Sequence, residues 1–260
     1  MQTSPFNQQL SIVIPVHDEQ DCIPLLIEAI DQAMPASLTY EIIVVDDHSQ
    51  DQTWSVLMQL QQRFNQLRLL KHSRNAGQSA AVISGVKAAR YAWIATLDGD
   101  GQNNPQDIPK LIATLQEQPE SPQGYVIAGH RVNRQDTVIK KLSSRVANAV
   151  RGWILKDHCP DSGCGIKLFP KSGFLALPHF NHIHRFIPAM FHALGITTIN
   201  VPVQHHQREH GRSKYGLNNR LWVGISDMLG VVWLRKRPFY VESTPASVTT
   251  TEPSHDHLSC

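Results

Sequence analysis

The first hundred or so residues alternate four times between a short apolar run and a segment with helical periodicity. The apolar runs are 10–16, 41–45, 67–70 and 93–97, and the helical segments are 21–33, 52–64, 79–90 and 104–116. Short apolar runs of this kind are typical of strands that are buried on both faces of a sheet. Their alternation with helices predicts an α/β fold, in which a mostly parallel central sheet is flanked by helices.

Three of these four predicted strands are followed by acidic residues. The acids are Asp18 and Glu19 after the first strand, Asp46, Asp47 and Asp51 at the second, and Asp98 and Asp100 after the fourth. The carboxyl ends of parallel strands meet at one edge of the sheet, which is where open α/β folds bind ligands. Because like charges gathered at one edge repel each other, we interpret these acids as part of a site for a cation and a polar ligand.

The sequence D-G-D-G-Q at 98–102 carries the most specific chemistry in the chain. Asp98, Asp100 and Gln102 offer hard oxygen ligands, which suit Mg²⁺ or Mn²⁺ better than zinc. Gly99 and Gly101 have no side chains, so we expect that a bulky ligand can approach the backbone there. Asp-Gly pairs are also common in turns, so a polar turn is the alternative interpretation of this motif on its own.

The rest of the chain continues the α/β pattern, with a polar segment at each end. Further strands are predicted at 125–128, 166–169 and 196–203, and further helices at 138–155, 184–194 and 217–234. Residues 1–9 are expected to be flexible, and 241–260, with eight Ser or Thr and no Lys or Arg, to be a disordered tail. A net charge of +2 does not indicate nucleic-acid binding, and the apolar runs are too short to predict a transmembrane helix.

Six motifs stand in a definite order along the chain. They lie at 15–19, 46–51, 98–102, 129–131, 161–165 and 208–215. In this order and at these spacings they resemble the family 2 glycosyltransferases of the GT-A fold, and most of all the polyprenyl-phosphate group that includes dolichol-phosphate mannose synthases. The resemblance covers roughly residues 10–237. It implies a catalytic domain at 10–215, followed by an amphipathic juxtamembrane helix at 216–240.

The resemblance also implies an activity and its residues. The enzyme would move a sugar from GDP-mannose or a UDP-hexose to dolichyl or undecaprenyl phosphate, with inversion at the anomeric carbon. Donor binding is implied for Pro15, His17, Glu19, Val45, Asp47, Asp98, Gly99, Arg208 and Lys214. Metal binding is implied for Asp98, Asp100 and Gln102, acceptor-phosphate binding for Arg131 and Arg145, and a catalytic role for Asp100, Arg131 and Asp161. His17 stands where the family usually has tyrosine, which leaves the choice between guanine and uracil open.

Several alternatives stay open at this point. The resemblance implies that the loop at 208–215, the closing loop, closes over the donor diphosphate. Asp161 either contacts the acceptor or this closing loop, or forms an Asx turn before Gly163. The histidines at 205, 206 and 210 are expected to be solvated loop residues rather than a metal cluster. For the whole chain, one alternative is a family 2 transferase with a glycan or soluble acceptor. Another is a non-catalytic nucleotide-sugar-binding subunit of a membrane glycan assembly.

The predicted helix at 217–234 has an apolar stripe. Its members are Leu221, Trp222, Ile225, Met228, Leu229, Val232 and Trp233, while Gly224, Ser226 and Asp227 lie on the other face. Seven Lys or Arg and two acids lie between 205 and 237, which favours an anionic membrane surface. We therefore expect a cytoplasmic, peripheral membrane protein that docks through 217–237. Packing of this helix on the catalytic domain, on a second copy or on a membrane-protein partner is the alternative.

Overall fold

Seven strands form one sheet at the centre of the computed structural model, which describes residues 6–119, 124–132, 151–152, 154–206 and 217–237. The strands are β1 (Gln9–Val16), β2 (Thr39–Asp46), β3 (Leu67–Lys71), β4 (Trp93–Thr96), β5 (Tyr125–Arg131), β6 (Lys167–Pro170) and β7 (Thr197–Val203). The helices are α1 (Ile23–Ala33), α2 (Thr53–Arg63), α3 (Gln78–Ala88), α4 (Asp107–Gln116), α6 (Lys171–Ala176), η1 (Ile183–Arg185), α7 (Ile187–Ala193) and α8 (Leu217–Arg235). The predicted α/β fold with a mostly parallel sheet is confirmed.

The order of the strands brings the candidate residues to one edge. The sheet runs β3-β2-β1-β4-β6-β5-β7, and β6 is antiparallel to both of its neighbours. The pairs β1–β2, β1–β4, β2–β3 and β5–β7 are parallel. The carboxyl ends of β1, β2, β4, β5 and β7 therefore lie at the same edge as the start of β6, so residues near 17, 47, 98, 131 and 165 are gathered there.

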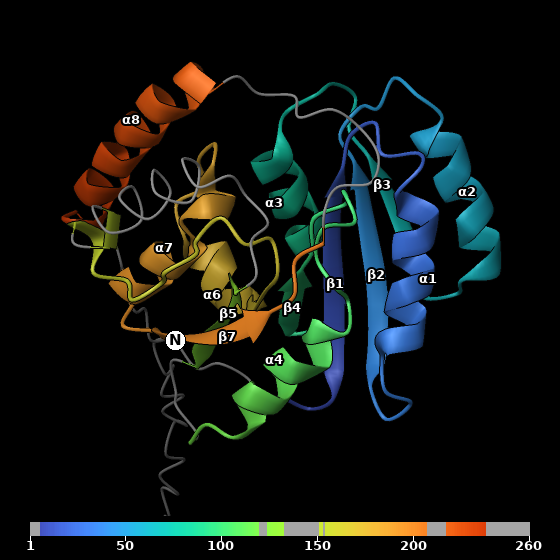
Figure 1. Ribbon diagram of the computed structural model, residues 1–260, viewed down its shortest axis with the longest axis horizontal. Helices are drawn as coiled ribbons and strands as arrows, with labels where there is room; N and C mark the ends of the chain where they lie inside the picture. The colour runs from blue at the N-terminus through green and yellow to red at the C-terminus, as the bar shows by residue number, and fades with distance from the viewer. Residues whose placement is uncertain (1–5, 120–123, 133–150, 153, 207–216, 238–260) are drawn as a thin grey trace, which may run out of the picture.

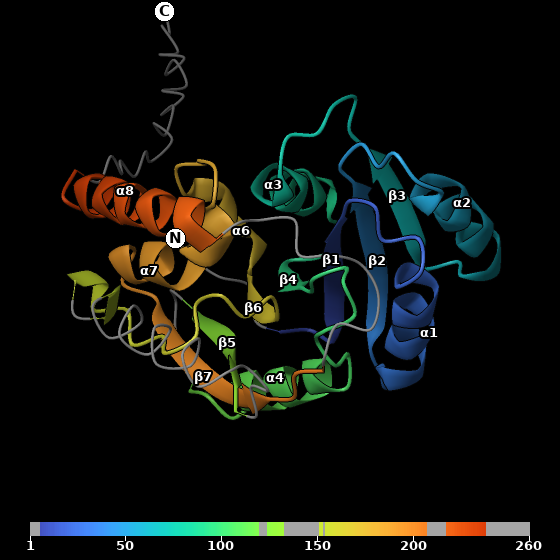
Figure 2. The same cartoon turned by 45° about the horizontal axis from the view of Figure 1, so that its top comes forward.

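Two hydrophobic clusters fill the two sides of the sheet. One cluster joins apolar residues of α1, α2 and α4 to the sheet, and the other joins apolar residues of α3, α6, α7 and α8 to its opposite face. Figures 1 and 2 show the same three layers, with α8 beside α7 and far from α1 and α2. This double cover explains why the strands have apolar residues on both faces.

The segment that was predicted as one helix at 184–194, interrupted at Pro188, differs in the structure. A 3-10 turn, η1, ends at Arg185, and α7 then begins at Ile187 with Pro188 in its first turn. The first turn of a helix has no intrahelical partners for its N–H groups, so proline starts this helix instead of breaking it. Of the predicted helix at 138–155, residues 151–152 and 154–155 are helical, and the other positions lie outside the described residues. Also outside them are 1–5, 120–123, 133–137, 207–216 and 238–260.

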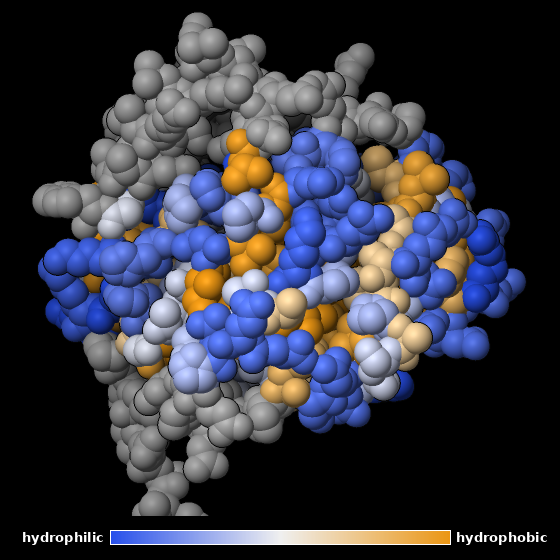
Figure 3. Space-filling model, turned by 60° about the horizontal axis from the view of Figure 1, so that its bottom comes forward, coloured by the Kyte–Doolittle hydropathy of each residue, from blue (hydrophilic) through white to orange (hydrophobic). Residues whose placement is uncertain are grey.

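The molecular surface follows from this layering. On the side that Figure 3 brings forward, hydrophilic residues cover most of the described surface, and hydrophobic residues show mainly in a strip across its middle. Across the described residues, no helix combines the length and the apolar character needed to cross a bilayer.

Candidate functional site

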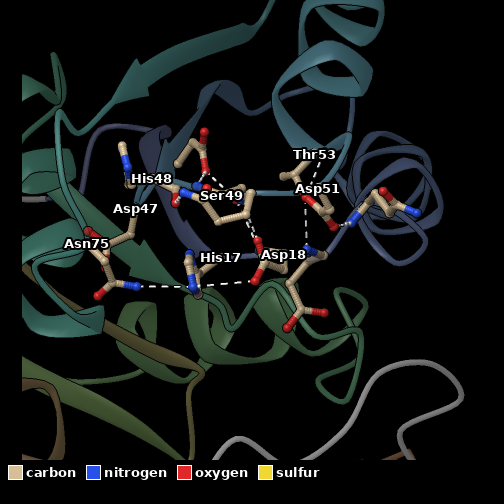
Figure 4. A network of polar contacts seen from close by, with 12 residues as sticks. His17, Asp18, Asp47, His48, Ser49, Asp51, Thr53 and Asn75 are labelled. Carbon is tan, nitrogen blue, oxygen red and sulfur yellow. Dashed lines mark hydrogen bonds and ion pairs between the residues drawn. The ribbon is translucent and has the colours of Figure 1, made fainter.

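The loops after β1 and β2 are joined by a network of polar contacts (Figure 4). Asp18 accepts a hydrogen bond from the backbone N–H of Gln50 at 2.7 Å, and its own N–H donates to Ser49 Oγ at 2.9 Å. The N–H of Glu19 donates to Thr53 Oγ1 at 2.9 Å. Asp18 has a positive φ of 51°, a conformation that favours Gly, Asn and Asp. The motifs at 15–19 and 46–51 therefore form one unit at the sheet edge.

Asp47 is the acid that holds the loop before α3. It is 3% exposed and accepts hydrogen bonds from the N–H groups of Ala76 at 2.9 Å and Gly77 at 2.7 Å. Its Oδ1 also lies 2.7 Å from His72 Nδ1, and His72 Nε2 lies 2.9 Å from Ser84 Oγ. Three partners thus surround the carboxylate that was predicted to meet the donor. Asp47 therefore holds the loop at 72–77 in place, and its contact with a donor stays a prediction.

The other predicted donor residues lie around the same corner of the sheet. Pro15 and Val45 are directly opposite each other in the β1–β2 register. Val45 is fully buried, with its side chain in the cluster under α3, so this structure offers a ligand no surface of that residue. His17 is half-buried, and its Nε2 lies 3.1 Å from Asn75 Nδ2, which brings the turn before α3 next to β1.

Asp98 lies at the centre of the edge and is half-buried. Gln78 Nε2, at the start of α3, donates to Asp98 Oδ1 at 2.8 Å. Burial and the neighbouring charge of Asp100 raise the pKa of Asp98 to about 6, although the positive charges of Lys167 and Arg131 and a hydrogen bond from Asn103 oppose the shift. The raised pKa means that the ionised carboxylate lacks enough positive charge around it, which a bound cation would provide.

The two glycines of the 98–102 motif have different roles. A Cβ on Gly99 would lie 2.5 Å from Val16 Cγ1 and 2.9 Å from the carbonyl oxygen of Pro15, so the close packing of this turn on β1 requires glycine. Gly101 has a φ of 72° and open space around its Cα. Packing on β1 is thus a structural reason for the glycine at 99, and the approach of a ligand to the backbone of Gly99 stays a prediction. Asp100 Oδ1 accepts the N–H of Gln102 at 3.2 Å.

Arg131 and Asp161 form a bidentate ion pair. Arg131 Nε donates to Asp161 Oδ2 at 2.7 Å and Nη2 donates to Oδ1 at 2.6 Å, and both side chains are largely buried. The backbone N–H of Arg131 also donates to the same carboxylate at 3.2 Å. Asp161 therefore orients the arginine, a role that neither of the two sequence-based interpretations of Asp161 included.

The end of β7 lies beside the 98–102 motif. His205 forms a β-bridge with Asn103, and the N–H of His206 donates to the carbonyl oxygen of Gln102 at 2.9 Å. This contact places the start of the predicted closing loop at the site. Arg208 and Lys214 of that loop, and Arg145, lie outside the described residues.

The sequence analysis gave no individual role to three residues at the site, although one of them, Gly165, belongs to the motif at 161–165. Gln78 contacts Asp98, and Gly165 packs so closely that a Cβ there would lie 2.2 Å from Asp98 Oδ2. Lys167 is 2% exposed and lies at the start of β6. A sequence signal for Lys167 was present, since it is a lone lysine within the otherwise apolar stretch 166–169. Lysine is seldom buried unless it has a partner, so a lysine in a predicted buried strand is a candidate functional residue.

The metal assignment has a mixed outcome. Within the described ranges, no group of three or more His, Cys, Asp or Glu side chains is arranged to hold a metal ion. Asp98 and Asp100 supply two carboxylates, and Mg²⁺ is commonly held by one or two carboxylates together with water and substrate phosphates. The pair therefore fits a cation that is shared with a diphosphate.

Comparison with known proteins identifies the family of the chain. The model of Glycosyl transferase family 2 matches residues 11–176. The chain is 34% identical over 235 residues to the dodecaprenyl-phosphate galacturonate synthase of Rhizobium johnstonii, which is 88% of this chain and 68% of that protein. It is also 34% identical over 213 residues to the undecaprenyl-phosphate 4-deoxy-4-formamido-L-arabinose transferase of Edwardsiella ictaluri, covering 81% of this chain and 64% of that protein. The chain thus spans about two thirds of the length of these relatives.

Solved structures support the same fold. Glucosyl-3-phosphoglycerate synthase from Mycobacterium tuberculosis, in complex with Mn²⁺, UDP and glucosyl-3-phosphoglycerate, superimposes with a TM-score of 0.62 at 14% identity. The match covers 88% of this chain and 80% of that one. Another structure of that enzyme contains Mg²⁺ and UDP. At this identity the likeness shows the fold alone. From the family match, the shared fold and the grouped acids, the chain is a member of glycosyltransferase family 2, with a GT-A fold.

Proposed function

We propose that this chain transfers a sugar from a nucleotide sugar to a polyprenyl phosphate. The observation that carries the proposal is the presence of Asp98 and Arg131 at the same edge of the sheet, in a chain about one third identical to two polyprenyl-phosphate sugar transferases. Such a site has acidic groups for a cation and a diphosphate on one side. On the other side it has an arginine for a second phosphate.

The donor half of the site is built from β1, β2 and the 98–102 motif. The diphosphate is expected to lie beside Asp98 and Asp100. Asp98 and Asp100 would hold Mg²⁺ or Mn²⁺, with Gln102 as a further oxygen ligand. A divalent cation held there supplies charge stabilisation to the diphosphate leaving group. Arg208 and Lys214 would add positive charge from the closing loop.

The acceptor half is built around Arg131. Two of its five N–H donors go to Asp161, and no contact of its Nη1 group appears among the described residues. Nη1 is therefore suited to a phosphate oxygen, with Arg145 as a second partner. A phosphomonoester has its second pKa near ~6, so the acceptor is largely a dianion at neutral pH and needs no strong general base.

The membrane-surface role of α8 belongs to the same proposal. Leu229 is 63% exposed and Trp233 is 57% exposed, and the exposed Lys236 and Arg237 follow them. Tryptophan and basic residues together suit an anionic lipid interface. The helix would bring the site to its lipid substrate at the inner face of the membrane.

A direct assay tests the proposal. Purified chain is incubated with Mn²⁺, undecaprenyl phosphate and a panel of UDP- and GDP-sugars, and products are identified by mass spectrometry. We expect one sugar to be transferred to the lipid phosphate. Arg131→Ala is expected to lose transfer by at least about tenfold while still binding the nucleotide. Transfer only to a soluble acceptor, or nucleotide binding without turnover in the wild type, would replace the proposal with one of its two alternatives.

A further inference from the structure

Lys167 is a charged residue in a buried place. Its side chain is 2% exposed, and it begins β6 between Thr96 of β4 and Ala128 of β5. Its Nζ donates to the carbonyl oxygen of Cys164, and no carboxylate lies within ion-pair distance of Nζ in the described part of the chain. Lysine is almost never fully buried without an ionic partner, because an isolated ammonium loses its hydration.

The geometry of the sheet puts Lys167 close to Asp98. Thr96, the last residue of β4, stands directly opposite Lys167, and Asp98 follows two residues later in the chain. Thr96 Oγ1 donates to the carbonyl oxygen of Gly165 at 2.7 Å, and Gly165 is packed against the Asp98 carboxylate. Lys167 is two residues beyond Gly165.

The electrostatics agree with this placement. Burial lowers the pKa of His184, which is hydrogen-bonded to Ser79 at the start of α3, and the positive charge of Lys167 adds to this shift. Lys167 therefore lies behind the site on the β6 side, where Gly165 packs against the Asp98 carboxylate, while Gln78 contacts that carboxylate from α3. An apolar residue at 167 would avoid the cost of burying a charge, so packing alone does not explain the lysine.

We propose that Lys167 is a buried positioning residue of the donor site, whose fixed positive charge beneath Asp98 lets the acidic edge accept a nucleoside diphosphate. The inference rests on the proposed function for the identity of this ligand. Asp98 and Asp100 bring two negative charges to a place where a diphosphate must also lie. Lys167 offsets part of their repulsion without occupying the space that the ligand needs.

This role predicts two changes of opposite sign when the charge is removed. Lys167→Gln keeps an N–H donor for the Cys164 carbonyl but removes the positive charge. Mn²⁺ alone should then bind at least about threefold more tightly, because cation–cation repulsion is lost. UDP or GDP in saturating Mn²⁺ should bind at least about threefold more weakly. The reason is that the positive charge of Lys167 no longer offsets the repulsion between the diphosphate and the two carboxylates.

The measurements are electron paramagnetic resonance of free Mn²⁺ for the metal and calorimetry for the two nucleotides. Lys167→Arg keeps the charge and should restore both affinities toward wild type. Lys171→Gln is the matched control: Lys171 Nζ also donates to a backbone carbonyl, that of Ala89 at 2.5 Å, but at the far end of β6. This control should change neither affinity, and thermal melting verifies that each variant is folded.

The two proposals fail in different ways. Equal weakening of Mn²⁺ and nucleotide binding by Lys167→Gln, or no change in either, would overturn the role of Lys167, and so would a wild type that binds neither nucleotide. A wild type that binds Mn²⁺ and a nucleotide but transfers no sugar to undecaprenyl phosphate would overturn the proposed function. In that case Lys167 is still judged by its two affinities.

Discussion

At the scale of single residues, Gly165 is the glycine at which an added Cβ would lie closest to a neighbouring atom. A Cβ there would lie 2.2 Å from Asp98 Oδ2 and 2.3 Å from its Cγ, so Gly165→Ala must displace the carboxylate or the start of β6. We predict at least a tenfold loss of transfer, or about 1.4 kcal/mol of transition-state stabilisation. The melting temperature should fall by only a few degrees.

Gly163 provides the control for this prediction. It lies in the same turn, and a Cβ on it would approach Arg131 Nη2 no closer than 3.4 Å. Gly163→Ala should therefore transfer sugar at close to the wild-type rate. Equal losses in the two alanine variants would mean that the turn as a whole is sensitive, and that the Asp98 contact is not the cause.

Glu41 gives a prediction about pH. Burial alone would raise the pKa of Glu41, but hydrogen bonds from the N–H of Arg90 at 2.6 Å, from Arg68 and from Ser11 lower it below its usual value. A carboxyl group with a lowered folded-state pKa stabilises the fold above its unfolded-state pKa, and this stability is lost as the pH falls through the folded-state value. Glu41→Gln should destabilise the protein by about 1–3 kcal/mol at pH 7, and by less in acid.

Thermal unfolding between pH 3 and pH 7 measures this difference. The comparison variant is Glu28→Gln, which removes a surface pair with Arg63 and should change stability by under about 1 kcal/mol. If Glu41→Gln were equally destabilising across this whole pH range, the ionised carboxylate would not be the source of the stability.

Single residues also show what the sequence can and cannot reveal. Asp98 and Asp100 were predicted as site residues because an acidic pair after an apolar strand is a local pattern. The space around Gly99 depends on its contact with Val16, and the burial of Val45 depends on α3, so neither follows from local spacing. Lys167 reaches the site only because β6 is inserted between β4 and β5.

At the scale of elements, α8 divides its predicted stripe between two faces. Met228 and Val232 pack against the cluster under α3, α6 and α7, together with the fully buried Val231, whereas Leu229 and Trp233 are exposed. Asp227 lies on the predicted polar face, and its Oδ2 is 2.8 Å from Nδ1 of His182, a residue of the domain. The side chains of Leu221, Trp222 and Ile225 lie outside the described residues. Part of the stripe therefore packs on the domain. The exposed part is the surface that we propose contacts lipid.

Flotation with anionic liposomes tests this exposed part. Wild type should float at low salt and bind less at high salt, because basic residues are attracted to anionic lipid through a screened interaction. A Leu229→Glu/Trp233→Glu variant should stay in solution without unfolding. Leu25→Glu is the matched control, since Leu25 is 60% exposed on α1, on the opposite side of the molecule (Figure 1), and it should float like the wild type. Flotation of the double variant would contradict the proposal that this surface binds the membrane.

Elements were predictable wherever one segment determined its own pattern. The first four strands and the helices between them follow from periodicity, and the structure has them within a few residues of the predicted bounds. The antiparallel placement of β6 and the short α6 were not predicted. Strand order depends on long-range packing, and a six-residue helix has too few turns to show a period.

At the scale of the whole molecule, the sheet joins two half-sites into one body. β1 and β2 carry the loops of the proposed donor half, β5 carries Arg131 of the proposed acceptor half, and β4, which Asp98 follows, lies between them. Because both halves belong to one continuous sheet, a ligand that binds the donor half should stabilise the entire fold against unfolding. Ligand stabilisation therefore reports on the site without any need for turnover.

Asp100 provides the sharpest test of this coupling. A nucleotide at about 100 times its Kd should stabilise the fold by ~2.7 kcal/mol, and in Mn²⁺ this should raise the melting temperature by about 5–10 °C. Asp100→Asn removes one carboxylate from the cation pair but keeps an oxygen that can accept the N–H of Gln102. The variant should melt like the wild type without ligands, lose most of the nucleotide-dependent increase, and transfer no sugar. A chelator added to the wild type should have the same effect, because the diphosphate would then meet Asp98 and Asp100 without the cation. Full stabilisation and transfer in excess chelator would contradict the metal role of this pair, and the diphosphate would then have to be held by cationic side chains such as Lys167 alone.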